Sequence, residues 1–407
     1  MRDVLGEGTV LCYGTNALPN QNYDSYAAAL VEVVPAVRDR LGLREPLAIG
    51  VSFPSDVEGQ SSIRNFGRLL PWLRFEWVDD NRAYQAHSDV VDCVTANSFA
   101  FHYFHDTVVK KNVYEPDWTA FERVFHDSGH GDELAMLPFR GGSKRSISTL
   151  PIAFGTPGLS STQLRKAVSN LEGAVAELRD LAFSAYSKLD PVFTLDLEPE
   201  PGCILDTADD VISFFSDYIP EEHRQHIGIC HDVCHSAVMF EDQRAVLRRY
   251  AEAGIRVNKV QISSALEVNV AAIGPESAAE RLAPFNEPRY LHQTGFTTGD
   301  SFQLHEDLPD ALAALARGDS PDTARTHFHV PIYLDEIDLG SGPITTTNDQ
   351  IADAIKAARE YHDCKIFEVE TYSWSVLPEP LRQGTLAESI ARELLWVKDL
   401  AQCENIT

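Results

Sequence analysis

The stretch that decides the fold runs from Phe193 to His235, beginning FTLDLEPEPGC and ending IGICHDVCH. Two apolar segments in it end in carboxylates, at Glu198 and Asp232, and a helix-like segment separates them. A strand that is buried on both faces, as in a parallel sheet, reads as a continuous apolar run. Polar residues at the C-terminal ends of such strands carry the chemistry of α/β barrels. The stretch therefore predicts a barrel whose catalytic rim includes Glu198, Asp232 and His235.

Strand-like and helix-like segments alternate along all 407 residues, which is typical of a parallel sheet with crossover helices. The apolar runs that predict eight barrel strands are residues 9–15, 47–53, 93–98, 146–153, 193–198, 227–232, 259–264 and 365–370. Helix-like periodicity is found at residues 23–40, 162–188, 208–218, 243–253, 348–361 and 386–400. We therefore predict a single (β/α)8 TIM barrel. A further apolar run, 326–333, lies between the last two strands.

Two segments exceed what a minimal barrel needs. Residues 266–325 form a long insertion between the strand at 259–264 and the last barrel strand, and residues 118–144 hold a helix and a basic, glycine-rich turn. Because βα loops lie at the C-terminal face of a barrel, we expect the insertion to overhang the catalytic rim. No Pro/Ser-rich linker and no fixed-period repeat interrupts the chain, so we expect one domain, 1–407.

The composition restricts the class of function. The formal net charge of −27 argues against binding to the phosphate backbone of nucleic acids, because like charges repel. No run of eighteen apolar residues is present, so we expect no membrane span. The first residues, MRDVLGEG, contain no apolar signal segment. The seven cysteines lie mostly in apolar runs, which suits reduced, buried thiols. We expect a soluble, cytoplasmic protein.

The segment CHDVCH, residues 230–235, has two interpretations. Cys230 and Cys234 resemble a zinc-knuckle fragment, but three residues separate them and no second cysteine pair follows. A structural zinc ion normally has four protein ligands. We favour the other interpretation, in which both are core thiols that alternate with residues of the rim.

Four oxygen-bearing side chains lie at or near the ends of four consecutive predicted strands, namely Glu198, Asp232, Gln261 and Glu370. Carboxylate and amide oxygens suit Mg²⁺ or Mn²⁺ and, less readily, Fe²⁺ or Zn²⁺, so we predict that they bind one divalent ion. Glu368 points the same way as Glu370, two residues along the strand, so either is a candidate ligand. We prefer Glu370 because it is nearer the strand's end.

Histidines supply a second set of candidates. The segment HFH places His327 and His329 on one face of an extended chain, because side chains two residues apart point the same way. His235 either joins them as a metal ligand or acts as an acid or base near neutral pH. The run RYLHQ adds two substrate-binding candidates, Arg289, which can hold an anionic group by paired hydrogen bonds, and His292.

Other polar segments are interpreted as structural. Glu200 lies in the rigid run PEP, which is expected to turn the chain away from the strand, so we interpret it as a solvent-exposed loop acid. The basic turn RGGSKR, residues 140–145, is interpreted as a flexible surface turn. The chain contains no glycine-rich phosphate loop, no nucleophile elbow and no HExxH metalloprotease motif.

Several sequence blocks occur in the order of a known family: LEPEPG, CHDVCH, KVQISSAL, RYLHQ, HFHVP and VETYSW. Over nearly its whole length, from CYGTN near Cys12 onward, the chain resembles the metabolite traffic protein EboE family, within the xylose-isomerase-like TIM-barrel superfamily. That family is implicated in moving or processing secondary metabolites. The resemblance therefore implies a small-molecule metabolite as ligand, and other proteins of a metabolite-export pathway as partners.

The wider superfamily includes sugar isomerases, epimerases and endonuclease IV-type enzymes, and it implies one metal ion held by the four strand-end residues. Similarity to its endonuclease branch implies a second metal site at His235, His327 and His329. The earlier strands, TANSF and STLPI, lack the histidines of a trinuclear nuclease centre. We therefore expect no full nuclease site.

Three functions remain open at this point. The leading hypothesis is a metal-dependent isomerase, epimerase or lyase acting on a small polyol or sugar-like metabolite, with Glu198, Glu370 and His235 as catalytic residues. The alternatives are a metal-dependent phosphoester hydrolase and a non-catalytic protein that hands a metabolite to partners. A shared fold does not choose among them.

Overall fold

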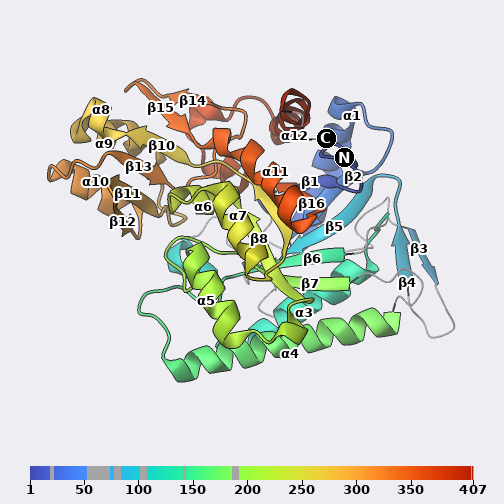
Figure 1. Cartoon of the computed structure of the whole chain (residues 1–407). Coiled ribbons are helices and arrows are strands. Elements are labelled where there is room, and N and C mark those ends of the chain that lie inside the picture. The colour runs from blue at the N-terminus through green and yellow to red at the C-terminus, as the bar shows by residue number, and fades with distance from the viewer. Residues whose placement is uncertain are drawn as a thin grey trace.

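Eight parallel strands close into a barrel (Figure 1). The computed structural model describes residues 1–18, 23–52, 74–77, 84–100, 108–140, 144–185, 192–404 and 406. The order around the barrel is β1-β16-β9-β8-β7-β6-β5-β2. The strands are β1 (Val10–Gly14), β2 (Leu47–Val51), β5 (Val91–Asn97), β6 (Lys144–Thr149), β7 (Val192–Leu197), β8 (Ile227–Asp232), β9 (Val257–Ile262) and β16 (Ile366–Val369). The predicted TIM barrel is confirmed, with all eight strands close to their predicted positions.

Helices follow the strands and cover the outside of the barrel (Figure 1). They are α1 (Tyr23–Leu41), α3 (Phe121–Met136), α4 (Ser161–Ala185), α5 (Ala208–Tyr218), α6 (Val233–Val238), α7 (Gln243–Glu252), α11 (Ile351–His362) and α12 (Leu386–Cys403). Capping boxes begin α5 at Thr207 and α12 at Thr385, where the side chain of each threonine accepts from the third residue of its helix. Among the described helices, none has the length and apolar character needed to cross a bilayer.

A second, antiparallel sheet of six strands lies to one side of the barrel, at the upper left of Figure 1. Its order is β12-β11-β13-β10-β15-β14. The elements are β10 (Leu266–Asn269), α8 (Val270–Ile273), α9 (Pro275–Leu282), β11 (Thr294–Thr298), β12 (Ser301–His305), α10 (Leu308–Ala316), β13 (Thr323–Thr326), β14 (Glu336–Asp338) and β15 (Pro343–Thr346). This sheet has its own apolar core, which includes Phe285, Leu315 and Phe328. We call it the inserted sheet; it continues to residue 346, past the predicted end of the insertion at 325.

The remaining described elements are short. A two-stranded hairpin pairs β3 (Arg74–Trp77) with β4 (Tyr84–His87). Single 3-10 turns are η1 (Thr15–Ala17), η2 (Lys110–Tyr114), η3 (Glu221–His223), η4 (Ala283–Phe285), η5 (Asn348–Gln350), η6 (Tyr372–Val376) and η7 (Glu379–Leu381). Residues 141–143 of the predicted basic turn lie outside the described residues.

The apolar run at 326–333 is a strand only at Thr326. Its backbone groups find other partners, because His327 donates to the carbonyl of Gln293 (2.8 Å) and Val330 to that of Ser264 (3.1 Å). Pro331 has no N–H to extend a ladder. The run is instead a buried connection that crosses from the inserted sheet to the barrel.

Polar contacts fasten the inserted sheet to the barrel. Lys110 forms an ion pair with Asp307 (2.6 Å), which caps α10. Arg325 of β13 donates to the carbonyl of Ala237 in α6 (2.9 Å). The sheet therefore meets the barrel beside α6 and the η2 turn, which both follow C-terminal ends of barrel strands.

A fully buried ion pair occupies the barrel interior below the rim. Lys259 Nζ lies 2.9 Å from Glu368 Oε1, and both side chains are inaccessible to solvent. A Cβ atom at Gly50 would lie 1.6 Å from Glu368 Oε2, so the glycine makes room for this carboxylate. Glu368 is thus committed to Lys259, which leaves Glu370 as the rim carboxylate of β16.

Candidate metal centre

Three buried carboxylates meet at the C-terminal ends of the barrel strands. Glu198 follows β7, Asp232 ends β8 and Glu370 follows β16. One oxygen of each lies within 4.8 Å of the others. Gln261 of β9 pairs in register with Asp232 and points inward, like Lys259 two residues before it. The four strand-end residues predicted to act together thus lie on adjoining strands of one rim.

Several polar atoms of this carboxylate cluster have no hydrogen-bond partner among the described residues. Glu198 Oε2, Asp232 Oδ2, Glu370 Oε2 and both polar atoms of the Gln261 amide are buried without a hydrogen-bond partner among the described residues. Burial, and then the charges of the neighbouring acids, raises the pKa of Glu198 and of Glu370 well above the usual range. A divalent cation would satisfy these oxygens and relieve their repulsion, so the residues present fit such an ion.

Neighbouring groups hold the carboxylates in place. Asp232 Oδ1 accepts from the backbone N–H of His235 (2.9 Å) and from Ser263 Oγ (2.7 Å). Glu370 Oε1 accepts from the side-chain amides of Asn16 and Asn97. One oxygen of each acid is therefore anchored, and the other faces the cluster.

Three histidines form a second cluster. His327 Nε2 lies 3.2 Å from His235 Nε2 and 3.2 Å from His329 Nε2. His235 comes from α6, whereas His327 and His329 follow β13. The three rings thus lie together, at the same end of the barrel as Asp232, since His329 Nε2 is 4.0 Å from Asp232 Oδ2.

The outer nitrogen of each ring faces an oxygen that has no proton to give. His235 Nδ1 donates to the carbonyl of Pro199 (2.9 Å), and His329 Nδ1 donates to that of Glu370 (2.9 Å). His327 Nδ1 donates to the amide oxygen of Gln293 (2.8 Å). Burial lowers the pKa of His329 to about 4 and lowers that of His327 well below its usual value, which favours the neutral form of both rings. The Nε2 lone pairs then converge, which is the arrangement of a metal site.

Asp232 belongs to both clusters. It groups with Glu198 and Glu370 on one side and with His235 and His329 on the other. A carboxylate in this position can bridge two ions, a harder one among oxygens and a softer one, such as Zn²⁺, among imidazoles.

Glu200 corrects the sequence interpretation. It was expected to be a solvent-exposed loop acid, but it is 5% exposed and lies 3.7 Å from His327 Nδ1. Its carboxylate accepts from the hydroxyl of Tyr114 (2.8 Å) and from the amide of Gln293 (3.3 Å). The rigid PEP segment turns this side chain toward the histidines rather than toward solvent.

The two predicted substrate-binding residues lie differently. His292 is fully buried, and its ring nitrogens contact the carbonyl of His327 and the carboxylate of Glu287, each at 2.8 Å. It therefore supports the backbone of His327 and has no free nitrogen for a substrate. Arg289 is half-buried, and its carbonyl accepts from the backbone of η2. Its contact with a substrate stays a prediction.

Sequence reasoning overlooked several residues of the site. The half-buried Tyr372 lies with its ring centroid 4.7 Å from that of His329. The Cys234 thiol groups with His327 and His329, although it was interpreted only as a core thiol. Gln293 was also missed, and only its place directly after His292 pointed to it.

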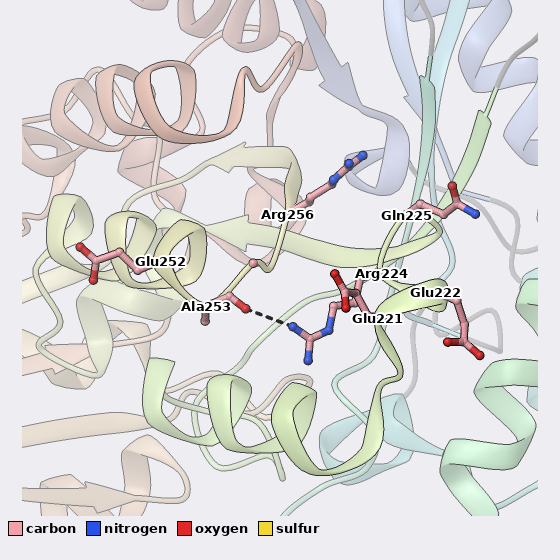
Figure 2. A pocket seen from close by; sticks show the side chains of 8 residues that line it. Glu221, Glu222, Arg224, Gln225, Glu252, Ala253 and Arg256 are labelled. Atoms are coloured by element: carbon pink, nitrogen blue, oxygen red, sulfur yellow. Dashed lines mark hydrogen bonds between the residues drawn. The ribbon is translucent and has the colours of Figure 1, made fainter.

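A surface groove of about 710 Å³ lies at the other end of the barrel (Figure 2). It is lined by residues that precede β8 and β9, including Arg224, Glu252 and Arg256. Arg224 donates to the carbonyls of Phe215, Ile219 and Ala253, so its guanidinium closes the ends of α5 and α7. The groove belongs to the structural face of the barrel.

The sequence matches no protein-family model and no curated protein. Among solved structures, a xylose isomerase-like TIM barrel protein from Mycobacterium smegmatis in complex with magnesium is similar at 11% identity and a TM-score of 0.49, over 97% of each chain. The IOLI protein with a bound zinc atom is similar at 10% identity and a TM-score of 0.46, over 97% of this chain and 98% of that one.

A D-allulose 3-epimerase from Methylomonas sp. in complex with D-allulose is similar at 10% identity and a TM-score of 0.44, over 96% of each chain. Similarities at this level assign no function to the chain. The resemblance to the EboE family stays a prediction.

Proposed function

We propose that this chain is a metal-dependent enzyme that moves a proton on a small polyol or sugar-like metabolite, as an isomerase, epimerase or lyase. The observation that carries the proposal is the set of unmet oxygens of Glu198, Asp232, Gln261 and Glu370 at one rim. Mn²⁺, Mg²⁺ and Zn²⁺ all accept such ligands. These four residues would hold the ion, which would supply Lewis-acid chemistry to the hydroxyl oxygens of a substrate.

The chain's own residues supply the proton transfer. Glu198 and Glu370 come from β7 and β16, with β8 and β9 between them, so their carboxylates reach the shared space from two sides. One can take a proton from substrate while the other returns it. His235 Nε2 is an additional acceptor, because its other ring nitrogen donates to Pro199.

The histidine cluster favours a second candidate, a metal-dependent phosphoester hydrolase. Two ions about 4 Å apart clamp the attacking and leaving oxygens in such enzymes. Asp232 lies where it could bridge two ions, between the carboxylates and the imidazoles. This candidate needs both clusters filled, whereas proton transfer needs only the carboxylate cluster.

An exchange experiment separates the two functions. The protein, reconstituted with Mn²⁺, Mg²⁺ or Zn²⁺, would be incubated in D₂O with a panel of aldoses, ketoses and polyols. Proton transfer predicts solvent deuterium in a substrate C–H bond, with loss in Glu198→Gln and Glu370→Gln. Hydrolysis predicts phosphate release from a parallel panel of phosphoesters and no deuterium. Binding of a sugar without either reaction would contradict both catalytic functions and favour a non-catalytic protein that carries a metabolite.

The cell compartment and the partners are part of the same proposal. All seven cysteines are free thiols, which suits the reducing cytoplasm. A small metabolite is the expected ligand. Partner proteins of a metabolite-export pathway are proposed only from the family resemblance.

A further inference from the structure

Gln293 is a fully buried amide with four polar contacts. Its Nε2 has two N–H groups to donate and lies within hydrogen-bond distance of three oxygens, the Tyr114 hydroxyl (2.9 Å), the Pro201 carbonyl (3.0 Å) and Glu200 Oε1 (3.3 Å). Its Oε1 accepts from His327 Nδ1 (2.8 Å). Its backbone carbonyl also accepts from the N–H of His327 (2.8 Å).

These contacts permit only one orientation of the amide. The carbonyl of Pro201 carries no proton, and Glu200 Oε1 already accepts from the hydroxyl of Tyr114, so both oxygens require the NH₂ group of Gln293. Tyr114 gives its own proton to Glu200, which leaves its oxygen free to accept from the amide. A flipped amide would set its oxygen against two acceptors, at a cost of about 1–3 kcal/mol for each buried group left unpaired.

The fixed amide determines which nitrogen of His327 carries the proton. Because Oε1 of Gln293 accepts, Nδ1 of His327 must donate, and Nε2 keeps its lone pair. His235 and His329 obtain the same tautomer from main-chain carbonyls, at Pro199 and Glu370. His327, the ring that contacts both others, depends on a side chain.

We propose that Gln293 is a positioning residue that holds His327 in its Nδ1–H tautomer and so sets the zinc affinity of the three-histidine cluster. The inference rests on the part of the proposed function in which the histidine cluster binds a second ion. In this proposal the network of Tyr114, Glu200 and Gln293 orients the ligand His327 but does not itself bind the ion. Loss of such a supporting hydrogen bond typically lowers metal affinity by 10–100-fold.

The test uses the full chain, zinc ions and two readouts. Gln293→Met keeps the length of the side chain and removes the acceptor, whereas Gln293→Glu keeps an oxygen toward His327 Nδ1. Gln303→Met, on an exposed position of β12, is the matched control. Competition with a chromophoric chelator measures zinc affinity. ¹⁵N spectra of histidine-labelled, metal-free protein, with His327 identified by its substitution, report the tautomer.

We expect Gln293→Met to lower zinc affinity 10–100-fold and to give a mixture of His327 tautomers. Gln293→Glu should restore the single Nδ1–H tautomer, because it keeps the acceptor, and Gln303→Met should change neither readout. Wild-type affinity and a single Nδ1–H tautomer in Gln293→Met would overturn the inference while leaving the metal centre intact. Absence of zinc binding at the histidines of the wild type would overturn the histidine site as well, but not the site among the carboxylates. If Gln293→Met fails to fold, the tautomer in Gln293→Glu decides, because a His327 protonated at Nε2 in that variant contradicts the proposal.

Discussion

The carboxyl group of Glu393 on α12 ties together two segments of the candidate metal centre. It is fully buried and accepts from Thr371 Oγ1 (2.5 Å) and from the backbone N–H of Ile332 (3.3 Å). Thr371 follows Glu370 directly, and Ile332 lies three residues past His329. A change of charge at Glu393 therefore affects the two segments that carry Glu370 and His329.

Burial raises the pKa of Glu393 from 4.5 to about 7. Below pH 4.5 Glu393 is protonated in both the folded and the unfolded state, so it does not lower the free energy of unfolding. Between pH 4.5 and 7 only the unfolded state loses its proton, and stability falls as the pH rises. Above pH 7 the full cost is present. One pKa unit corresponds to about 1.4 kcal/mol, so the full cost is about 3 kcal/mol.

Glu393→Gln should remove this cost, because the amide keeps an oxygen for Thr371 and Ile332 and never ionises. We expect urea unfolding to show a gain under about 1 kcal/mol at pH 5, rising to about 3 kcal/mol at pH 8. Glu122→Gln, at an exposed site on α3, is the control and should give no pH-dependent difference. A difference between Glu393→Gln and wild type that stays constant from pH 5 to 8 would refute the reasoning.

Three further outcomes are expected. Elemental analysis should find a divalent ion in the purified or reconstituted protein. Metal occupancy should fall in Glu198→Gln and Asp232→Asn and stay unchanged in the exposed control Glu222→Gln. A protein that takes up no metal would contradict the proposed metal centre. Removal of zinc with a chelator should speed amide hydrogen exchange in residues 266–346 more than in the barrel strands, because two of the three histidines follow β13. An equal change in the exchange rates of both parts would show that no ion joins them. At physiological salt the protein should not bind duplex DNA in a fluorescence anisotropy titration, given its net charge of −27.

Much of the barrel could be predicted from the sequence because its signals are local. A parallel strand buried on both faces, such as Ile227–Asp232, shows both its apolar run and its terminal carboxylate within six residues. The same rule placed Glu198 and Glu370, since strands that close one barrel bring their C-terminal ends to one rim. The choice of Glu370 over Glu368 also agrees with the structure, which pairs Glu368 with Lys259.

Residues whose positions depend on distant partners could not be predicted. The environment of Glu200 is set by Tyr114 and Gln293, which are 86 and 93 residues away. Proline on both sides correctly indicated a rigid turn, but the direction of that turn is a tertiary property. The same holds for one ring nitrogen of His292, which contacts the His327 carbonyl 35 residues away, whereas Glu287 on the other nitrogen is a local partner.

The carboxylate cluster and the histidine cluster depend on different parts of the fold. The carboxylates need only the barrel, because β7, β8 and β16 carry them. The histidines need the inserted sheet to dock, since His235 comes from α6 and its two partners from the connection after β13. Arg325 and Gln293 hold that connection, Arg325 through the carbonyl of Ala237 and Gln293 through the backbone of His327. Asp232 then faces both clusters, so an ion bound among the histidines would both complete the site and join the inserted sheet to the barrel.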